Sequence, residues 1–117
     1  YKGSNLDPTA VEPTQALRAA TRTGALSQGR DDCGLVKEGF KADLCVMDVT
    51  GPQWCPMTSP VYNVAYAGDG SDVVLTMCDG EVVYDGAAAP ESRWPGMDIE
   101  RVKREVSDRA HRIISEL

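Results

Sequence analysis

Residues 34–48 read Gly-Leu-Val-Lys-Glu-Gly-Phe-Lys-Ala-Asp-Leu-Cys-Val-Met-Asp, and this stretch decides how the rest of the chain is organised. Glu38 and Gly39 predict a chain reversal with a positive φ angle at the glycine, which has no Cβ to disfavour that conformation. Residues 42–47 then carry the apolar, β-branched signature of a strand. The Asp43 side chain is expected to accept hydrogen bonds from backbone N–H groups of the preceding turn, which would hold the start of the strand.

A helix is predicted before this stretch. Pro13 suits a first helical turn, where its missing N–H would be unpaired in any case. Residues 14–24 have helical spacing, with mainly small side chains on one face, and residues 25–28 continue the helix as far as Gly29, a natural terminator. A face of small side chains allows close approach to a neighbour, but it buries little apolar area by itself.

A hairpin is predicted after the strand. Residues 73–84 contain two apolar runs around Asp79-Gly80, the pair most typical of a type I′ turn. Between strand and hairpin, residues 53–60 hold Pro56 and Pro60 and directly follow Pro52, so they predict an extended loop. Trp54 is expected to anchor this loop by packing. Residues 61–67 fit either a short strand or a helical turn.

The chain is predicted to end in an amphipathic helix that docks on the body of the protein. Asp98 can cap its first turn. The apolar residues recur at helical spacing and form one stripe: Ile99, Val102, Val106, Ala110, Ile113 and Leu117.

Composition excludes several classes of protein. With 117 residues the chain forms one domain at most, and its net charge of −6 argues against nucleic acid as a partner, because phosphate binding needs a basic face. No apolar run reaches the roughly 18 residues that a bilayer crossing needs, and no secretory signal is evident. We therefore expect a cytoplasmic protein without a membrane or nucleic-acid partner.

The cysteines favour the same compartment. Cys33, Cys45, Cys55 and Cys78 include no closely spaced pair of the kind that zinc sites use. Free and mostly buried thiols in a reducing cytoplasm are therefore expected, and two disulfides in a secreted domain are the alternative.

No catalytic, cofactor-binding or metal-binding residue is assigned to this chain. His111 is the single histidine and falls in the charged terminal helix, without a carboxylate placed to orient it. Asp31-Asp32 reads as a solvated turn, and residues 68–71 lack the lysine of a phosphate-binding loop. The serines considered as nucleophiles have no histidine pattern beside them: Ser27, Ser59 and Ser71.

Three motifs in this order carry a family resemblance. Residues 16–25 read Ala-Leu-Arg-Ala-Ala-Thr-Arg-Thr-Gly-Ala, residues 34–44 end in Ala-Asp-Leu, and residues 73–86 hold Asp-Gly-Glu-Val-Val-Tyr-Asp-Gly. Together they resemble the C-terminal end of a metal-dependent amidohydrolase of the branch that includes cytosine, guanine and adenosylhomocysteine deaminases and chlorohydrolases. The departures from that pattern are residues 25–29, which read Ala-Leu-Ser-Gln-Gly where the usual ending is closer to Ala-x-x-Leu-Gly, and cysteines at positions 45 and 78.

The resemblance implies a parent fold with a (β/α)8 barrel and a small β-sandwich built from both chain termini. The expected fold class is α+β: residues 1–30 would supply the last helix of the TIM barrel. Residues 31–86 would form an antiparallel or mixed sheet, half of the composite sandwich, and residues 87–117 a loop and the terminal helix. The family's metal-binding histidines and aspartate are expected upstream of residue 1, so zinc or iron would belong to the parent enzyme and no cofactor to this chain.

The function implied is hydrolysis of a non-peptide C–N bond in a purine, pyrimidine or related heterocycle, with this chain as an inactive structural part. The alternative is a stand-alone oligomerisation or binding module without a catalytic role, and a third reading is an unrelated α+β domain. Unpaired sheet edges recruit other chains, so a homo-oligomer or association with the missing barrel part is expected. The substrate does not follow from these residues.

Overall fold

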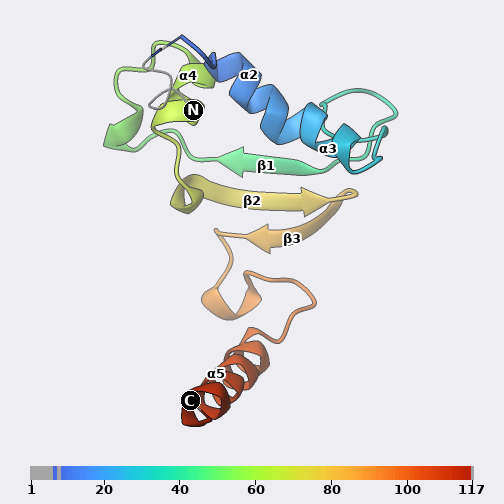
Figure 1. Ribbon diagram of the computed structural model, residues 1–117, viewed down its shortest axis with the longest axis vertical. Coiled ribbons are helices and arrows are strands. Elements are labelled where there is room, and N and C mark those ends of the chain that lie inside the picture. The colour runs from blue at the N-terminus through green and yellow to red at the C-terminus, as the bar shows by residue number, and fades with distance from the viewer. Residues whose placement is uncertain (1–6, 8, 117) are drawn as a thin grey trace.

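The computed structural model describes residues 7 and 9–116 (Figure 1). The helices are α2 (Pro13–Arg18), η1 (Ala19–Thr23), α3 (Gly24–Ser27), η2 (Pro52–Trp54), α4 (Pro60–Tyr66), η3 (Gly70–Asp72), η4 (Pro90–Ser92) and α5 (Ile99–Ser115). The strands are β1 (Leu44–Met47), β2 (Val73–Cys78) and β3 (Glu81–Asp85). The described residues thus form an α+β structure, and the sheet is antiparallel throughout rather than mixed.

The predicted N-terminal helix is confirmed as a continuous run of α2, η1 and α3. Its start is fixed by a capping box, in which Glu12 N–H donates to Gln15 Oε1 at 3.0 Å. The chain leaves the helix through Gly29, whose φ angle is +73°. The middle turn is wider than sequence reasoning predicted: Gly24 N–H bonds to the carbonyl of Ala19, five residues back, as in a π-helix.

The three strands form one sheet in the order β1-β2-β3, so β1 and β3 are its edges. The hairpin between β2 and β3 turns at Asp79 and Gly80, whose φ angles of +51° and +84° confirm the predicted type I′ turn. Gly39 has φ +81°, as the turn before β1 required. Regular pairing of β1 starts at Leu44, two residues later than predicted.

Residues 61–67 were compatible with either a short strand or a helical turn, and in the structure they belong mainly to a helix, α4. Its buried residue Asn63 holds the proline-rich loop, because its side-chain amide donates to the carbonyls of Trp54 at 3.1 Å and Pro56 at 3.3 Å. Trp54 is only 2% exposed, which confirms its predicted role as a packing anchor.

The described residues bury little apolar surface. Cys33 and Trp54 are the buried hydrophobic residues among them, together with Pro13 at the start of α2. The radius of gyration is 18.4 Å, whereas a compact chain of this length has about 13 Å. The expectation of mostly buried cysteines is therefore wrong: all four are free thiols, but Cys45, Cys55 and Cys78 are exposed.

The C-terminal helix is present, but it does not dock on the body as predicted. Asp98 caps it, accepting a hydrogen bond from Arg101 N–H at 2.9 Å. Past Ile99, every residue of α5 is exposed, and the helix projects from the β3 side of the sheet, whereas the N-terminal helix runs along the β1 side (Figure 1). A search of the described residues finds no helix that is both long and apolar enough to cross a membrane.

Candidate functional site

Asp43 joins the start of β1 to the tip of the hairpin. Its Oδ1 accepts a hydrogen bond from Asp79 N–H at 2.8 Å, and the next N–H, that of Gly80, donates to the Ala42 carbonyl at 3.1 Å. The prediction that Asp43 holds the preceding turn is therefore wrong in its partner. Both positive-φ residues of a type I′ turn present their N–H groups here, and residues 42 and 43 bind them. The Ala-Asp and Asp-Gly motifs of the sequence thus form one structural unit.

Ion pairs surround this unit. Arg30 donates to Asp43 Oδ2 at 2.8 Å, and Lys41 donates to Asp79 Oδ2 at 3.1 Å. The hydrogen bond from Asp79 N–H lowers the pKa of the Asp43 carboxyl below its usual range, with Arg30 contributing in the same direction. The hydrogen bond to Asp79 raises the pKa of the Lys41 ammonium. The lowered pKa of Asp43 and the raised pKa of Lys41 keep both groups charged at neutral pH.

The loop before β1 is fastened to the N-terminal helix by Arg22. Its guanidinium donates to the carbonyls of Asp31 at 3.0 Å and Cys33 at 2.8 Å, and it lies over the Phe40 ring at 5.2 Å. Gly34 allows this approach. A Cβ at that position would lie 2.9 Å from Arg22 Cα, so only glycine fits. The role of Arg22 was not predictable from the sequence, since a lone arginine on a helix has no distinctive pattern.

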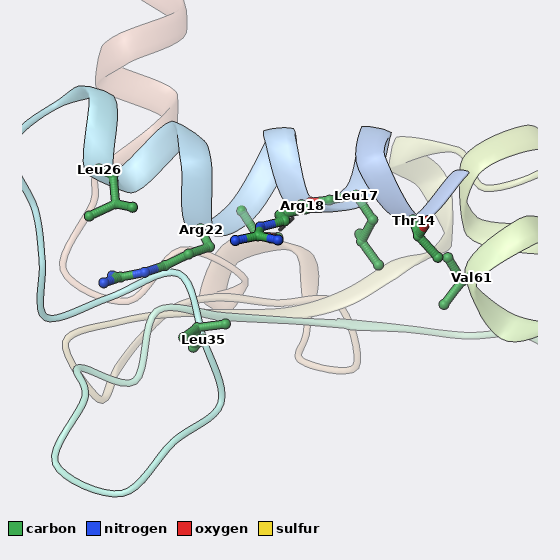
Figure 2. Close-up of a pocket in the computed structure, with 8 residues that line it drawn as sticks. Thr14, Leu17, Arg18, Arg22, Leu26, Leu35 and Val61 are labelled. Carbon is green, nitrogen blue, oxygen red and sulfur yellow. Dashed lines mark hydrogen bonds between the residues drawn. The ribbon is translucent and has the colours of Figure 1, made fainter. Parts of the chain in front are cut away.

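Two open hollows flank this helix. One, of about 440 Å³, is lined by helix residues including Leu17 and Leu26, by Leu35 of the loop and by Val61 of α4 (Figure 2). The second, which we call the helix–sheet groove, has about 790 Å³ and lies between the helix and strands β1 and β2. Its lining includes the small-residue face of the helix (Ala20, Gly24, Ala25) and the strand residues Cys45, Met47 and Thr76.

Two hydroxyl groups of the helix donate to its own backbone. Thr21 donates to the Leu17 carbonyl at 2.8 Å and Ser27 to the Gly24 carbonyl at 2.7 Å. His111 lies exposed on α5, which stands apart from the N-terminal helix (Figure 1). Among the described residues, no three His, Cys, Asp or Glu side chains come together to hold a metal ion. Both hollows are lined by apolar side chains, among them Leu17 and Leu35, and are therefore suited to receiving other apolar side chains.

The sequence is similar to those of known deaminases. The chain is 35% identical over 115 residues to the 5-methylthioadenosine/S-adenosylhomocysteine deaminase of Pelotomaculum thermopropionicum. The aligned residues make up 98% of this chain and 25% of the relative. The protein of the same name from Desulforamulus reducens is 38% identical over 113 residues, covering 96% of this chain and 25% of the relative. The chain thus spans about a quarter of the length of these relatives.

The fold is similar to that of a solved enzyme. An adenosine deaminase from Xanthomonas campestris with bound zinc superposes with a TM-score of 0.87 at 24% identity, over 97% of this chain and 25% of that one. The sequence model of the amidohydrolase family matches residues 1–83. The matched residues include the N-terminal helix, the start of β1 with Asp43, and most of the hairpin. Because the match extends over more than half of the sequence, the chain belongs to the amidohydrolase family.

Proposed function

We propose that this chain is the C-terminal part of an aminohydrolase that removes the amino group from the adenine ring of a 5′-substituted nucleoside. In that reaction water supplies the oxygen of a new C–O bond at C6, the exocyclic C–N bond breaks, and ammonia leaves. The observation that carries the proposal is the 35% identity to a 5-methylthioadenosine/S-adenosylhomocysteine deaminase over 98% of this chain. The zinc-bound adenosine deaminase with the same fold supports it.

In this proposal the chain contributes structure rather than a reacting group. The run α2–η1–α3 is the last helix of the barrel, and β1-β2-β3 is half of the composite sandwich. The TM-score of 0.87 over 97% of the chain supports this placement. The described residues offer no set of metal ligands, so a catalytic zinc would be held by other parts of the parent enzyme.

We also propose that the barrel part of the parent enzyme fills the two open hollows. The small-residue face that lines the helix–sheet groove can approach a neighbour closely. Burying apolar surface of this kind against other polypeptide stabilises the protein by about 25 cal/mol for each Å² removed from water. We therefore infer that upstream polypeptide fills the groove in the parent enzyme.

The test is an assay of the complete protein that contains this sequence. Ammonia release and the conversion of the adenine chromophore are measured with 5′-methylthioadenosine, S-adenosylhomocysteine, adenosine, cytosine and guanine. We expect the two 5′-thio nucleosides to react with the highest kcat/KM. Preference for cytosine or guanine would contradict the substrate class, and failure to deaminate any of the five would overturn the proposed function.

The same assay of the 117-residue chain alone tests its structural role. We expect no deamination with or without added zinc, because neither His111 nor Asp31 has partners that could form a metal site. Zinc-dependent turnover by the chain alone would refute this part of the proposal.

A further inference from the structure

The hollow of about 440 Å³ beside the N-terminal helix is bordered by apolar side chains that the described residues leave open to water. Leu26 of α3 is 50% exposed there, and Leu35 of the loop is 47% exposed. Val36, the next residue of the loop, is 91% exposed. Single exposed apolar residues are common, but several of them around one hollow indicate a surface that other polypeptide covers.

Positive charges gather at the same hollow. Arg18 and Arg22 line it, and Figure 2 shows both on the side of the helix that faces Leu35. Lys37 is close to Arg22, because Arg22 Cζ and Lys37 Nζ each lie 5.2 Å from the centre of the Phe40 ring. None of the three cations forms an ion pair with a described residue, and the residues that line the hollow include no carboxylate. The hollow is therefore locally basic in a chain whose net charge is −6.

Arg18 is the cation of this group whose charge is least compensated. Arg22 donates to the carbonyls of Asp31 and Cys33 and lies over the Phe40 ring. Arg18 has no ion pair within the described part of the chain, and it precedes Arg22 by four residues on the helix. Like charges at this spacing repel each other. A carboxylate beside Arg18 would offset that repulsion.

Polypeptide of the same protein is available to cover the hollow. The relatives that match this chain from end to end are about four times as long, since the chain makes up 25% of each. A second copy of the same surface is a poor cover. In a two-fold dimer an interface patch meets itself, so the unpaired cations of one copy would face those of the other.

We propose that a segment of the same protein outside residues 1–117 fills this hollow with apolar side chains and places a carboxylate against Arg18. The proposal rests on the proposed function only in taking this chain as part of a longer enzyme. The apolar contacts remove Leu26 and Leu35 from water. The ion pair then forms at a partly covered site, where water screens it less than on an open surface.

The first experiment converts this ion pair into a covalent bond in the complete protein. In the Arg18→Lys variant, a carbodiimide activates a carboxylate that lies beside the amine at position 18. The amine attacks the activated carbonyl carbon, an amide bond forms, and the reagent leaves as its urea. We expect peptide mass spectrometry to find position 18 linked to an aspartate or glutamate outside residues 1–117. Lys41 and Asp79, whose side-chain atoms are 3.1 Å apart, serve as the internal standard.

Isotope-labelled and unlabelled subunits, mixed before the reaction, show whether the link lies within one subunit, as we expect. A link from position 18 to another residue of this chain would overturn the proposal, and so would a link between subunits. The absence of any link at position 18, in a sample where Lys41 is joined to Asp79, would overturn it as well.

The second experiment compares Arg18→Gln with Arg18→Glu in the complete protein, two variants that match in size and differ in charge. If a carboxylate faces position 18, Arg18→Glu opposes two negative charges and should lower the melting temperature more than Arg18→Gln does. At a solvated position the order would reverse, because a glutamate four residues before Arg22 is attracted to it. An Arg18→Glu variant that is at least as stable as Arg18→Gln would therefore contradict the proposal.

Neither measurement uses enzyme activity, so the two proposals can fail separately. A complete protein that forms the link at position 18 but deaminates none of the five compounds would retain this inference and lose the proposed function. A protein that deaminates the 5′-thio nucleosides without forming the link would lose only the inference.

Discussion

At the residue scale, Asp43 stabilises the fold through its charge. Its carboxylate binds Asp79 N–H and Arg30, and these contacts lower its pKa in the native state. A group whose native pKa is lowered contributes stability at neutral pH, and this contribution is lost as the pH falls below about 4, through the native pKa. We therefore expect Asp43→Asn to lower the melting temperature at pH 7, and this difference from the wild type to shrink steadily as the pH falls toward 3.

The measurement is the melting temperature of both proteins across this pH range. Asp31→Asn is the control, because it removes one carboxylate from an exposed side chain that forms none of the ion pairs at the strand entry. A difference in melting temperature between wild type and Asp43→Asn that stays constant or increases toward acidic pH would contradict this prediction. The charge of Asp43 would then not stabilise its contact with the hairpin tip.

The sequence predicted that Asp43 binds a turn, but not which turn it binds. A carboxylate at the entry of a strand predicts a hydrogen bond to a turn, because aspartate commonly binds nearby backbone N–H groups. The turn that it binds lies 36 residues further along the chain. Only the pairing of β1 with β2 brings the hairpin tip to Asp43, and a local pattern contains no information about that pairing.

At the scale of elements, the approach of the loop to the N-terminal helix depends on Gly34. A Cβ there would lie 2.9 Å from Arg22 Cα and 3.0 Å from the Thr21 carbonyl oxygen, and φ is +81°. Gly34→Ala should therefore lower the free energy of unfolding by about 1–2 kcal/mol for the left-handed backbone. It should cost about 1–3 kcal/mol more for overpacking against the helix.

Gly39→Ala separates these two effects. Gly39 has the same φ of +81°, but an added Cβ would meet nothing within 4 Å. Its substitution should cause only the backbone part of the loss when both variants are unfolded in urea. Equal losses in the two variants would mean that the loop does not press against the helix at Gly34.

The elements themselves followed well from the sequence, and their distortions did not. The Asp79-Gly80 pair predicted the hairpin, and Pro13 and Gly29 marked the limits of the helix. The π-helical turn at Ala19–Thr23 was not predicted, since the residues there have ordinary helical preferences. It lies where Gly34 and Arg22 join the loop to the helix, so a tertiary contact accompanies the wider turn.

At the scale of the whole molecule, the described residues bury few hydrophobic side chains. The radius of gyration of 18.4 Å and the exposed α5 describe elements held apart rather than packed together. We expect the isolated chain to lose its circular dichroism gradually on heating and to bind a hydrophobic dye at low temperature. The complete protein should melt cooperatively and bind little dye. A single sharp transition of the monomeric isolated chain would contradict this expectation.

The sequence by itself determined the local elements and the family, because turn chemistry, capping and motif order act over a few residues. Tertiary structure alone decided that Asp43 clamps the hairpin, that Arg22 fastens the loop, and that three of the four cysteines are exposed. It also decided that α5 stands apart from the sheet, whereas the sequence predicted docking. The physical reason is that an apolar stripe specifies burial but not the surface that buries it, which depends on how distant parts of the polypeptide meet.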